Sequence, residues 1–171
     1  GFATQKVQWD NEKITATTAK GQNYAITLQD GTKVWLNADS KLEFLPNYKN
    51  SSQRLVKLSG EAYFQVSKNK KQPFIVQTNK QLIKVLGTHF NVDAYEKEIK
   101  TTLIEGSVQV SLIASEKLNT VQPSIILQPG QQSELSEDDR LRISSVDVEA
   151  AIAWKSGYFM FDHEDLTSIL K

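Results

Sequence analysis

The sequence of 171 residues contains no cysteine and only two histidines, His89 and His163. Without cysteine, neither disulfide bonds nor thiolate metal sites can form. Two imidazoles alone do not complete a zinc site of the usual kind. We therefore expect neither a metal nor a cofactor in this protein.

The sequence also lacks an excess of charge and long apolar runs. Twenty basic residues balance twenty acidic residues, so the composition does not favour nucleic acid as a partner. Apolar runs such as Ser124 to Leu127 have the length of a strand, far below the roughly 18 residues that cross a bilayer. Residues 1–4 show neither the charged region nor the apolar region of a signal peptide.

Apolar and polar residues alternate with period two along most of the chain, which predicts half-buried strands. About ten strands are expected, and the polar, acidic run Ser133 to Arg140 is predicted to be an exposed loop. The predicted strands are Tyr24–Gln29, Lys33–Leu36, Lys41–Leu45, Val56–Val66, Phe74–Thr78, Gln81–Val85, Leu86–Ala94, Thr102–Leu112, Ser124–Leu127 and Leu141–Ser144. The fold class is therefore mainly β, either an antiparallel β-sandwich or a rolled, β-helix-like barrel.

Glycines mark the turns and the irregular points of these strands. Asp30 and Gly31 lie between two apolar runs, which predicts a hairpin turn. Gly60, Gly87 and Gly106 interrupt strand patterns. At these three positions we expect a bulge or a close approach of another part of the chain.

The pattern divides the chain into four parts. Residues 1–23 form an approach segment, and residues 24–145 form the β domain. Residues 146–157 form a linker helix, for which Asp147 is the expected N-cap. Residues 158–171 have the pattern of a strand and the first turns of a helix, which predicts the truncated start of a second, small α+β domain.

No nucleophile elbow, phosphate-binding loop or dinucleotide motif occurs in the sequence. Glu61 and Glu105 each lie beside a strand glycine and could form the carboxylate pair of a glycosidase. The alternative interpretation, which we favour, is that both are exposed strand carboxylates. His89 alternates away from Phe90 and is expected at the surface.

Four groups of residues carry a resemblance to a known family. They are Leu28–Asn37 followed by Ser40; Arg54–Val66; Pro73–Val76 leading to Val85–Val92; and Glu105–Val110 with Leu127–Gln131. In this order and spacing the chain resembles the FecR family of anti-sigma factors, in particular the branch found in Bacteroidetes. The motif positions are Asp30, Gly31, Gly60, Glu61, Phe64, Phe90, Glu105 and Gly106. The tail from Trp154 to Phe161 looks like the linker and opening strand of the small domain that comes next in this branch.

The resemblance implies the periplasmic part of a single-pass inner-membrane protein that regulates an extracytoplasmic-function sigma factor. The sigma factor would bind a cytoplasmic segment that these residues do not include. The expected periplasmic partner is the signalling domain of a TonB-dependent outer-membrane transporter. The resemblance leaves open whether this domain or the next one contacts the transporter.

The resemblance also implies a reaction at one bond. Some members of the wider family are thought to cleave themselves at a Gly–Thr bond by an N-to-O acyl shift, and Gly87–Thr88 falls at that position. Such a reaction needs a hydroxyl held against the preceding carbonyl. The alternative is a threonine that faces the core with its hydroxyl bonded to backbone, beside a glycine required for packing. Apart from this single event we expect no enzymatic activity.

A different class of function also fits the β pattern. A carbohydrate-binding β-sandwich would need an exposed aromatic platform, for which Trp35, Tyr48 and Tyr63 are the candidates. Trp35 and Tyr63 fit a role as half-buried packing groups equally well.

Overall fold

The computed structural model describes residues 13–113 and 124–156, which form thirteen strands and a short helical segment. The strands are β1 Ile14–Thr17, β2 Tyr24–Thr27, β3 Lys33–Leu36, β4 Lys41–Phe44, β5 Arg54–Gln65, β6 Phe74–Gln77, β7 Gln81–Val85, β8 His89–Ala94, β9 Ile99–Glu105, β10 Val108–Leu112, β11 Ser124–Leu127, β12 Gln131–Leu135 and β13 Leu141–Ser145. They are followed by helix α1, Val148–Ala151, and one 3-10 turn, Ala153–Lys155. No helix in the described ranges is long and apolar enough to cross a membrane.

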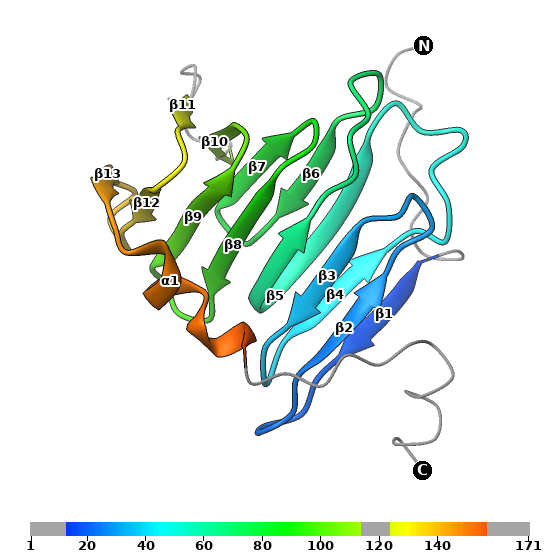
Figure 1. The fold of residues 1–171 in the computed structure, drawn as a ribbon, viewed down its shortest axis with the longest axis horizontal. Coiled ribbons are helices and arrows are strands. Elements are labelled where there is room, and N and C mark those ends of the chain that lie inside the picture. Colours follow the sequence, from blue (N-terminus) through cyan, green and yellow to red (C-terminus); the bar gives the residue numbers. More distant parts are fainter. Residues whose placement is uncertain (1–12, 114–123, 157–171) are drawn as a thin grey trace.

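The long strand β5 belongs to two sheets (Figure 1). Its first half pairs with β4 and β6, in a sheet that continues to β1 on one side and to β7, β10 and β11 on the other. Its second half pairs with β3 and β8, in a sheet that also contains β2, β9, β12 and β13. We call these sheet A and sheet B. Every pair is antiparallel except β5 with β6, which are parallel.

The strand changes sheets at Gly60, which has a φ of +97°. A side chain at this position would place its Cβ 2.2 Å from the Ser40 hydroxyl oxygen. Glycine is therefore required here both by the left-handed backbone and by the close approach of Ser40. The predicted close approach at Gly60 is confirmed.

The main core lies between the two sheets and is built from the apolar face of each strand. The rings of Phe64 and Phe90 are stacked in sheet B with centroids 5.0 Å apart. The Phe64 ring also meets the edge of Phe74 from sheet A at 6.1 Å. These aromatic side chains join the two sheets. Their contact stabilises the fold, because burying large apolar surfaces is the dominant favourable contribution to folding.

The mainly β fold predicted from alternation is confirmed, and so is the hairpin at Asp30–Gly31, which joins β2 to β3. Two sheets face each other, as in a sandwich, and the shared strand β5 connects them along one side, as in a rolled barrel. The fold therefore has features of both predicted architectures. The short C-terminal helix is also present, but the helix predicted within residues 146–157 is split into α1 and the 3-10 turn. Asp147 caps α1 as expected, through a bond from the Glu149 N–H to its carboxylate.

The sequence interpretation missed two strands and joined two others into one. The predicted strand Thr102–Leu112 is β9 in sheet B followed by β10 in sheet A, and the two strands separate at Gly106, which has a φ of +95°. The first strand that was missed is β1. No strand was predicted in residues 1–23, whereas β1 pairs there with β4 at the edge of sheet A. Most of β1 is exposed, so it carries no alternation signal. The second is β12, which occupies Ser133 to Leu135 of the predicted loop. Ser133 faces the core in β12, and this inward polar residue hid the period-two pattern. The predicted second domain, residues 158–171, lies outside the described residues.

Candidate functional site

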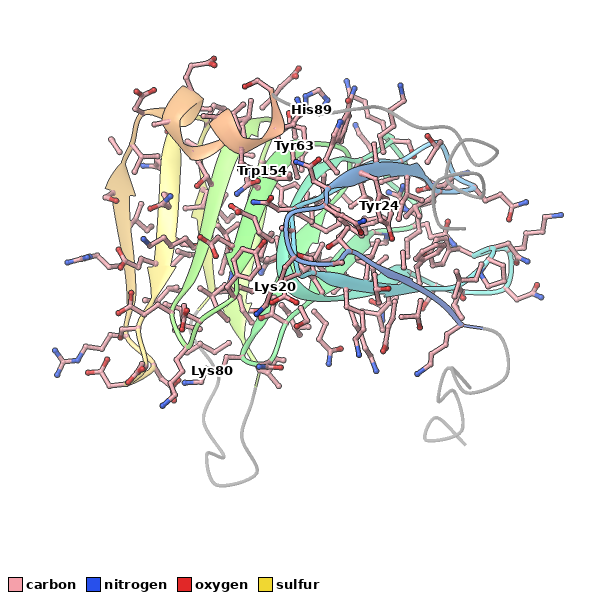
Figure 2. All side chains as sticks on the ribbon, turned by 90° about the horizontal axis from the view of Figure 1, so that it is seen from below. Lys20, Tyr24, Tyr63, Lys80, His89 and Trp154 are labelled. Carbon is pink, nitrogen blue, oxygen red and sulfur yellow. The ribbon has the colours of Figure 1, made fainter. Side chains whose placement is uncertain are left out.

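The outer face of sheet B carries a small apolar cluster that the C-terminal segment covers. Three of its side chains are buried and three are partly buried; the six are Ala25, Trp35, Tyr63, Ile104, Ile152 and Trp154. Figure 2 shows Trp154 and Tyr63 close together beneath the helical segment. We call residues 146–156 the exit segment, because the chain leaves the β domain along it.

An aromatic pair forms the centre of this face. The rings of Trp35 and Tyr63 meet edge to face, with centroids 5.4 Å apart. The Lys155 ammonium lies 4.8 Å from the centroid of Trp35 and 4.2 Å from that of Tyr63. Both distances are within the range of cation–π attraction. The cluster thus combines an apolar contact with a charged one.

Beside this pair, a buried carboxylate connects the sheet to the exit segment. The two oxygens of Glu61 accept hydrogen bonds from the side-chain amides of Asn37 and Asn91, each at 2.9 Å. The amide oxygen of Asn91 in turn accepts a hydrogen bond from the indole N–H of Trp154 at 3.1 Å. Glu61 therefore fixes the orientation of Asn91, and Asn91 holds Trp154.

Burial raises the pKa of Glu61 above its ordinary value, although the hydrogen bonds from Asn91 and Asn37 lower it in part and the nearby Asp93 carboxylate raises it further. No cation lies among these causes. Burial removes water from the carboxylate and disfavours its charged form. Amide donors carry no charge, so they offset this effect only in part and the pKa stays raised.

A second cluster surrounds the buried Arg54, the first residue of β5, and contains the partly buried carboxylate of Asp30. The side chain of Arg54 is 0% exposed. Its guanidinium donates to Asp30 Oδ2 at 2.7 Å and to the backbone oxygens of Ser67, Gln72 and Leu86 at 2.9, 2.8 and 3.4 Å. Asp30 lies in the turn between β2 and β3, Ser67 and Gln72 follow β5, and Leu86 precedes β8. Arg54 therefore joins loops that are far apart in the chain.

Asp30 is held by this arginine and by its own turn. Its oxygens accept hydrogen bonds from the Thr32 hydroxyl at 2.8 Å and the Thr32 N–H at 3.1 Å. Burial alone would raise the pKa of Asp30, but the hydrogen bonds and charge of Arg54, together with the bonds from Thr32, lower it below its ordinary value. Asp30 is thus kept ionised, which is the opposite of the effect on Glu61.

The Gly87–Thr88 bond precedes β8 and lies in close contact with the end of β9. Thr88 is buried, and its hydroxyl donates to the backbone oxygen of Glu105. A Cβ at Gly106, which has a φ of +95°, would lie 2.4 Å from that hydroxyl oxygen. At Gly87 a Cβ would lie 2.5 Å from the side chain of Lys68. These contacts agree with the packing alternative, in which the hydroxyl is bonded to backbone and the glycine is needed for space.

Alternation in the predicted strand Leu86–Ala94 places Leu86 and Thr88 on the apolar face together with Phe90. This prediction is correct for Thr88 and wrong for Leu86. The strand β8 begins only at His89, and a register shift occurs between His89 and Phe90. Leu86 lies before that strand and is 43% exposed. Alternation cannot be extended through an irregular connection, because a bulge changes which face each residue takes.

The two carboxylates considered for a glycosidase lie at different places. Glu61 pairs with Asp93, which pairs with Lys100 in β9. Glu105 lies five residues farther along β9, or about 17 Å at the usual rise of a strand. This exceeds the separation that glycoside hydrolysis requires. The prediction of an exposed carboxylate holds for Glu105, which is paired with His89 at 3.3 Å, and is wrong for Glu61.

The candidate aromatic platform is also absent from the surface. Trp35, Tyr48 and Tyr63 are all buried. Tyr48 belongs to a separate cluster with Leu45 and Leu55, so the three rings do not share one face. Within the described ranges, no group of three acidic, histidine or cysteine side chains could hold a metal ion.

The motif positions fall into four places. Asp30 and Gly31 form the turn at Arg54. Gly60 lies against Ser40 where β5 changes sheets, and the neighbouring Glu61 is bonded to Asn91. Phe64 and Phe90 are the stacked core rings. Glu105 and Gly106 contact Thr88. The motif thus marks structural junctions of the domain and is not collected into one cavity.

Three residues of these junctions were not singled out from the sequence. Arg54 carried a usable signal, because it continues the inward, even-numbered face of β5 that includes Val56 and Leu58. A charged residue on a core face predicts a buried partner. Asn91 and Trp154 carried none, since they are 63 positions apart and only the folded chain joins them.

Together, the fold and the site define an all-β domain of two sheets that share one strand and carry a docked C-terminal segment. Residues 14–109, more than half of the chain, match the family described as FecR protein. The chain belongs to the FecR family. No curated protein matches the chain significantly.

Two crystal structures are similar to this chain. Each is of a protein from Parabacteroides distasonis assigned as an anti-sigma factor, one at 2.50 Å and the other at 1.65 Å resolution. Both are 30% identical to this chain, with a TM-score of 0.76. The matches cover 85% and 84% of this chain and, in both cases, 65% of the other chain. The chain thus spans about two thirds of the length of these proteins.

Proposed function

We propose that the chain is the periplasmic, signal-receiving part of a transmembrane anti-sigma factor. The observation that carries this proposal is the FecR match, together with the likeness to the Parabacteroides anti-sigma factors along most of the chain. A sigma factor of the extracytoplasmic-function class is the cytoplasmic partner in this proposal. The periplasmic partner is the signalling domain of a TonB-dependent outer-membrane transporter.

The architecture suits a protein that binds other proteins. In the described part of the chain, β1, β2, β11 and β13 each pair with a strand on one side only. Such an edge can accept a strand from another chain, which is a common way for β domains to bind peptides. The buried aromatic rings, in contrast, give no support to the carbohydrate-binding alternative.

Deletion of the gene tests the regulatory part of the proposal. We expect transcription of the genes that depend on the cognate sigma factor to stop responding to the transporter's substrate. Re-expression of the full-length protein restores the response. An unchanged response in the deletion strain contradicts the proposal.

A pulldown locates the contact with the transporter. The full periplasmic region is mixed with the signalling domain of a neighbouring transporter, and the experiment is repeated with residue 158 and everything after it removed. Binding that persists in the shorter protein assigns recognition to the β domain, and binding that is lost assigns it to the region after it. If neither protein binds, the proposed partner is wrong.

Self-cleavage at Gly87–Thr88 is a separate proposal. In this reaction the Thr88 hydroxyl oxygen attacks the Gly87 carbonyl carbon. The C–N bond breaks, the hydroxyl proton is transferred to the Thr88 nitrogen, and an ester forms between Gly87 and the Thr88 side chain. Water then hydrolyses the ester to a Gly87 carboxylate and a free Thr88 amine. The proposal draws support from the resemblance alone, because the bond from the Thr88 hydroxyl to the Glu105 oxygen agrees with the packing alternative. Two fragments on a denaturing gel that are absent in Thr88→Ala support it, whereas a chain that stays intact after long incubation contradicts it.

A further inference from the structure

The exit segment has no core of its own. Helix α1 spans four residues and the 3-10 turn three, and neither contributes a buried residue. A helix this short is not stable by itself in water. Something other than its own hydrogen bonds must keep it in place on sheet B.

The start of the segment is joined to the β domain by the Val146 N–H, which donates to the Gly130 oxygen at 3.0 Å, and Ile152 adds an apolar contact. Two neighbouring side chains supply the other specific contacts of the helical part. Trp154 reaches down to Asn91 through its indole N–H, and Lys155 lies over the rings of Trp35 and Tyr63. We propose that Trp154 and Lys155 act as a releasable latch, which holds the exit segment on the outer face of sheet B and can open without unfolding the β domain.

Asn91, which accepts the hydrogen bond from Trp154, keeps its other hydrogen bond when the latch opens. Asn91 donates to Glu61, and Glu61 also accepts from Asn37, so these bonds exist independently of Trp154. When Trp154 leaves, the Asn91 oxygen loses one partner at a face that water can then reach. Only a group that stays buried without a partner incurs a large cost, so opening leaves no such group behind.

The cationic half covers the aromatic pair. With the segment docked, Trp35 and Tyr63 are almost completely buried, although they lie on the outside of sheet B and not in the main core. Release exposes this apolar face to water, which is unfavourable, so the free energy favours return of the segment to the docked position. The chain continues beyond Ser156. A force on that later part of the chain, or a partner bound to it, would therefore break the contacts of Trp154 and Lys155 before it disturbed the core.

The latch is a property of this chain alone, so it does not rest on the proposed function. Hydrogen exchange of the 171-residue protein, measured by mass spectrometry, tests it. The amides to monitor are those of Ala151, Ile152, Lys155 and Ser156, which are all bonded within the segment. The variants are Trp154→Phe, which removes the N–H and keeps a ring, Lys155→Met, which removes the charge, and the two combined.

We expect exchange of these four amides to rise about fivefold in Trp154→Phe, about threefold in Lys155→Met and at least tenfold in the double variant. Lys155→Arg keeps a cation and is expected to exchange like the unchanged protein. The control Lys84→Met alters an exposed lysine of β7 in the other sheet and leaves the segment unaffected. The urea midpoint is expected to remain the same in every variant.

Two results would overturn the latch. Unchanged exchange in the double variant would mean that the two side chains do not hold the segment. A fall in the urea midpoint that accounts for the faster exchange would mean that the segment opens only when the whole domain unfolds. The outcome does not depend on any sigma factor or transporter, so it can fail while the proposed function stands.

Discussion

Two carboxylates in this domain, the partly buried Asp30 and the buried Glu61, show opposite behaviour. Asp30 is paired with a fully buried arginine, which lowers its pKa despite burial. Among the described residues, the carboxylate of Glu61 accepts hydrogen bonds from the side-chain amides of Asn37 and Asn91, and burial raises its pKa. A charged partner keeps a buried carboxylate ionised, and neutral donors do not offset the loss of water to the same extent.

The difference corresponds to different roles in the structure. Arg54 and Asp30 join loops of the β domain to each other, so their removal affects the whole fold. Glu61 supports Asn91, which holds the exit segment through Trp154. We infer that the first cluster maintains the domain and that the second attaches the exit segment to it. Substitutions in each cluster test this division of roles.

The largest effect is expected from Arg54→Met. The variant removes the donor of the partly buried Asp30 and of three backbone oxygens. Loss of one partner of a buried ion pair costs about 3–5 kcal/mol, and urea unfolding measures the change. Lys84→Met is the matched control, with an expected change within about 0.5 kcal/mol. In Arg54→Met combined with Asp30→Asn, the loss should be smaller than the sum of the single losses, and an additive result would show that the pair is not coupled.

A smaller effect is expected from Gly60→Ala, at the point where β5 changes sheets. The new methyl group would collide with Ser40 and the residue would keep a positive φ, so we expect a loss of about 2–3 kcal/mol in the free energy of unfolding. Gly130→Ala is the control, since Gly130 has a φ of +89° and nothing within 4 Å of the added atom. Gly130→Ala therefore measures the cost of a side chain at positive φ alone, which we expect to be about 1 kcal/mol in the free energy of unfolding. Equal losses in the two variants would mean that the contact with Ser40 has no importance.

The dependence of stability on pH should separate the two carboxylates. The folded pKa of Asp30 is below its usual 3.8, so its stabilisation is present above pH 3.8 and is lost as the pH falls through the folded value. The folded pKa of Glu61 is above its usual 4.5, so stability decreases as the pH rises from 4.5 through that value. Urea unfolding at a series of pH values checks both. Asp30→Asn should remove the acid-side loss, and Glu61→Gln should remove the decrease above pH 4.5. Profiles that the two variants leave unchanged would contradict these assignments.

The smallest effect on global stability is expected from Glu61→Gln. The substitution keeps the shape but replaces one acceptor by an NH₂ group, which cannot accept from both Asn37 and Asn91. We expect a change of about 1 kcal/mol or less in the free energy of unfolding, because the buried charge is removed at the same time. A loss as large as that of Arg54→Met would show that the two clusters are equivalent.

Much of the fold could be predicted from the sequence, because alternation reports directly which face of a strand is buried. The core rings Phe64 and Phe90 and the hairpin at Asp30–Gly31 were found in this way. Alternation failed at the exposed strand β1 and at β12, where Ser133 faces inward. It also ran β9 and β10 together, because the pattern continues through Gly106 although the chain there passes from one sheet to the other.

The site was harder to predict than the fold. The motif residues Gly60 and Glu61 were identified, but their contacts with Ser40 and Asn91 depend on strand pairing. The link from Asn91 to Trp154 joins the middle of the chain to its last described turn. Periodicity describes a single element and contains no information about which distant element will cover it.

Hydrogen exchange of Arg54→Met and Glu61→Gln, measured side by side with mass spectrometry, tests the division of roles most directly. The account predicts that Arg54→Met raises exchange throughout the strands of both sheets, in proportion to its loss of global stability. It predicts that Glu61→Gln raises exchange mainly in residues 148–156. Exchange that rises throughout both sheets in Glu61→Gln, or that rises only in the exit segment in Arg54→Met, would contradict the account.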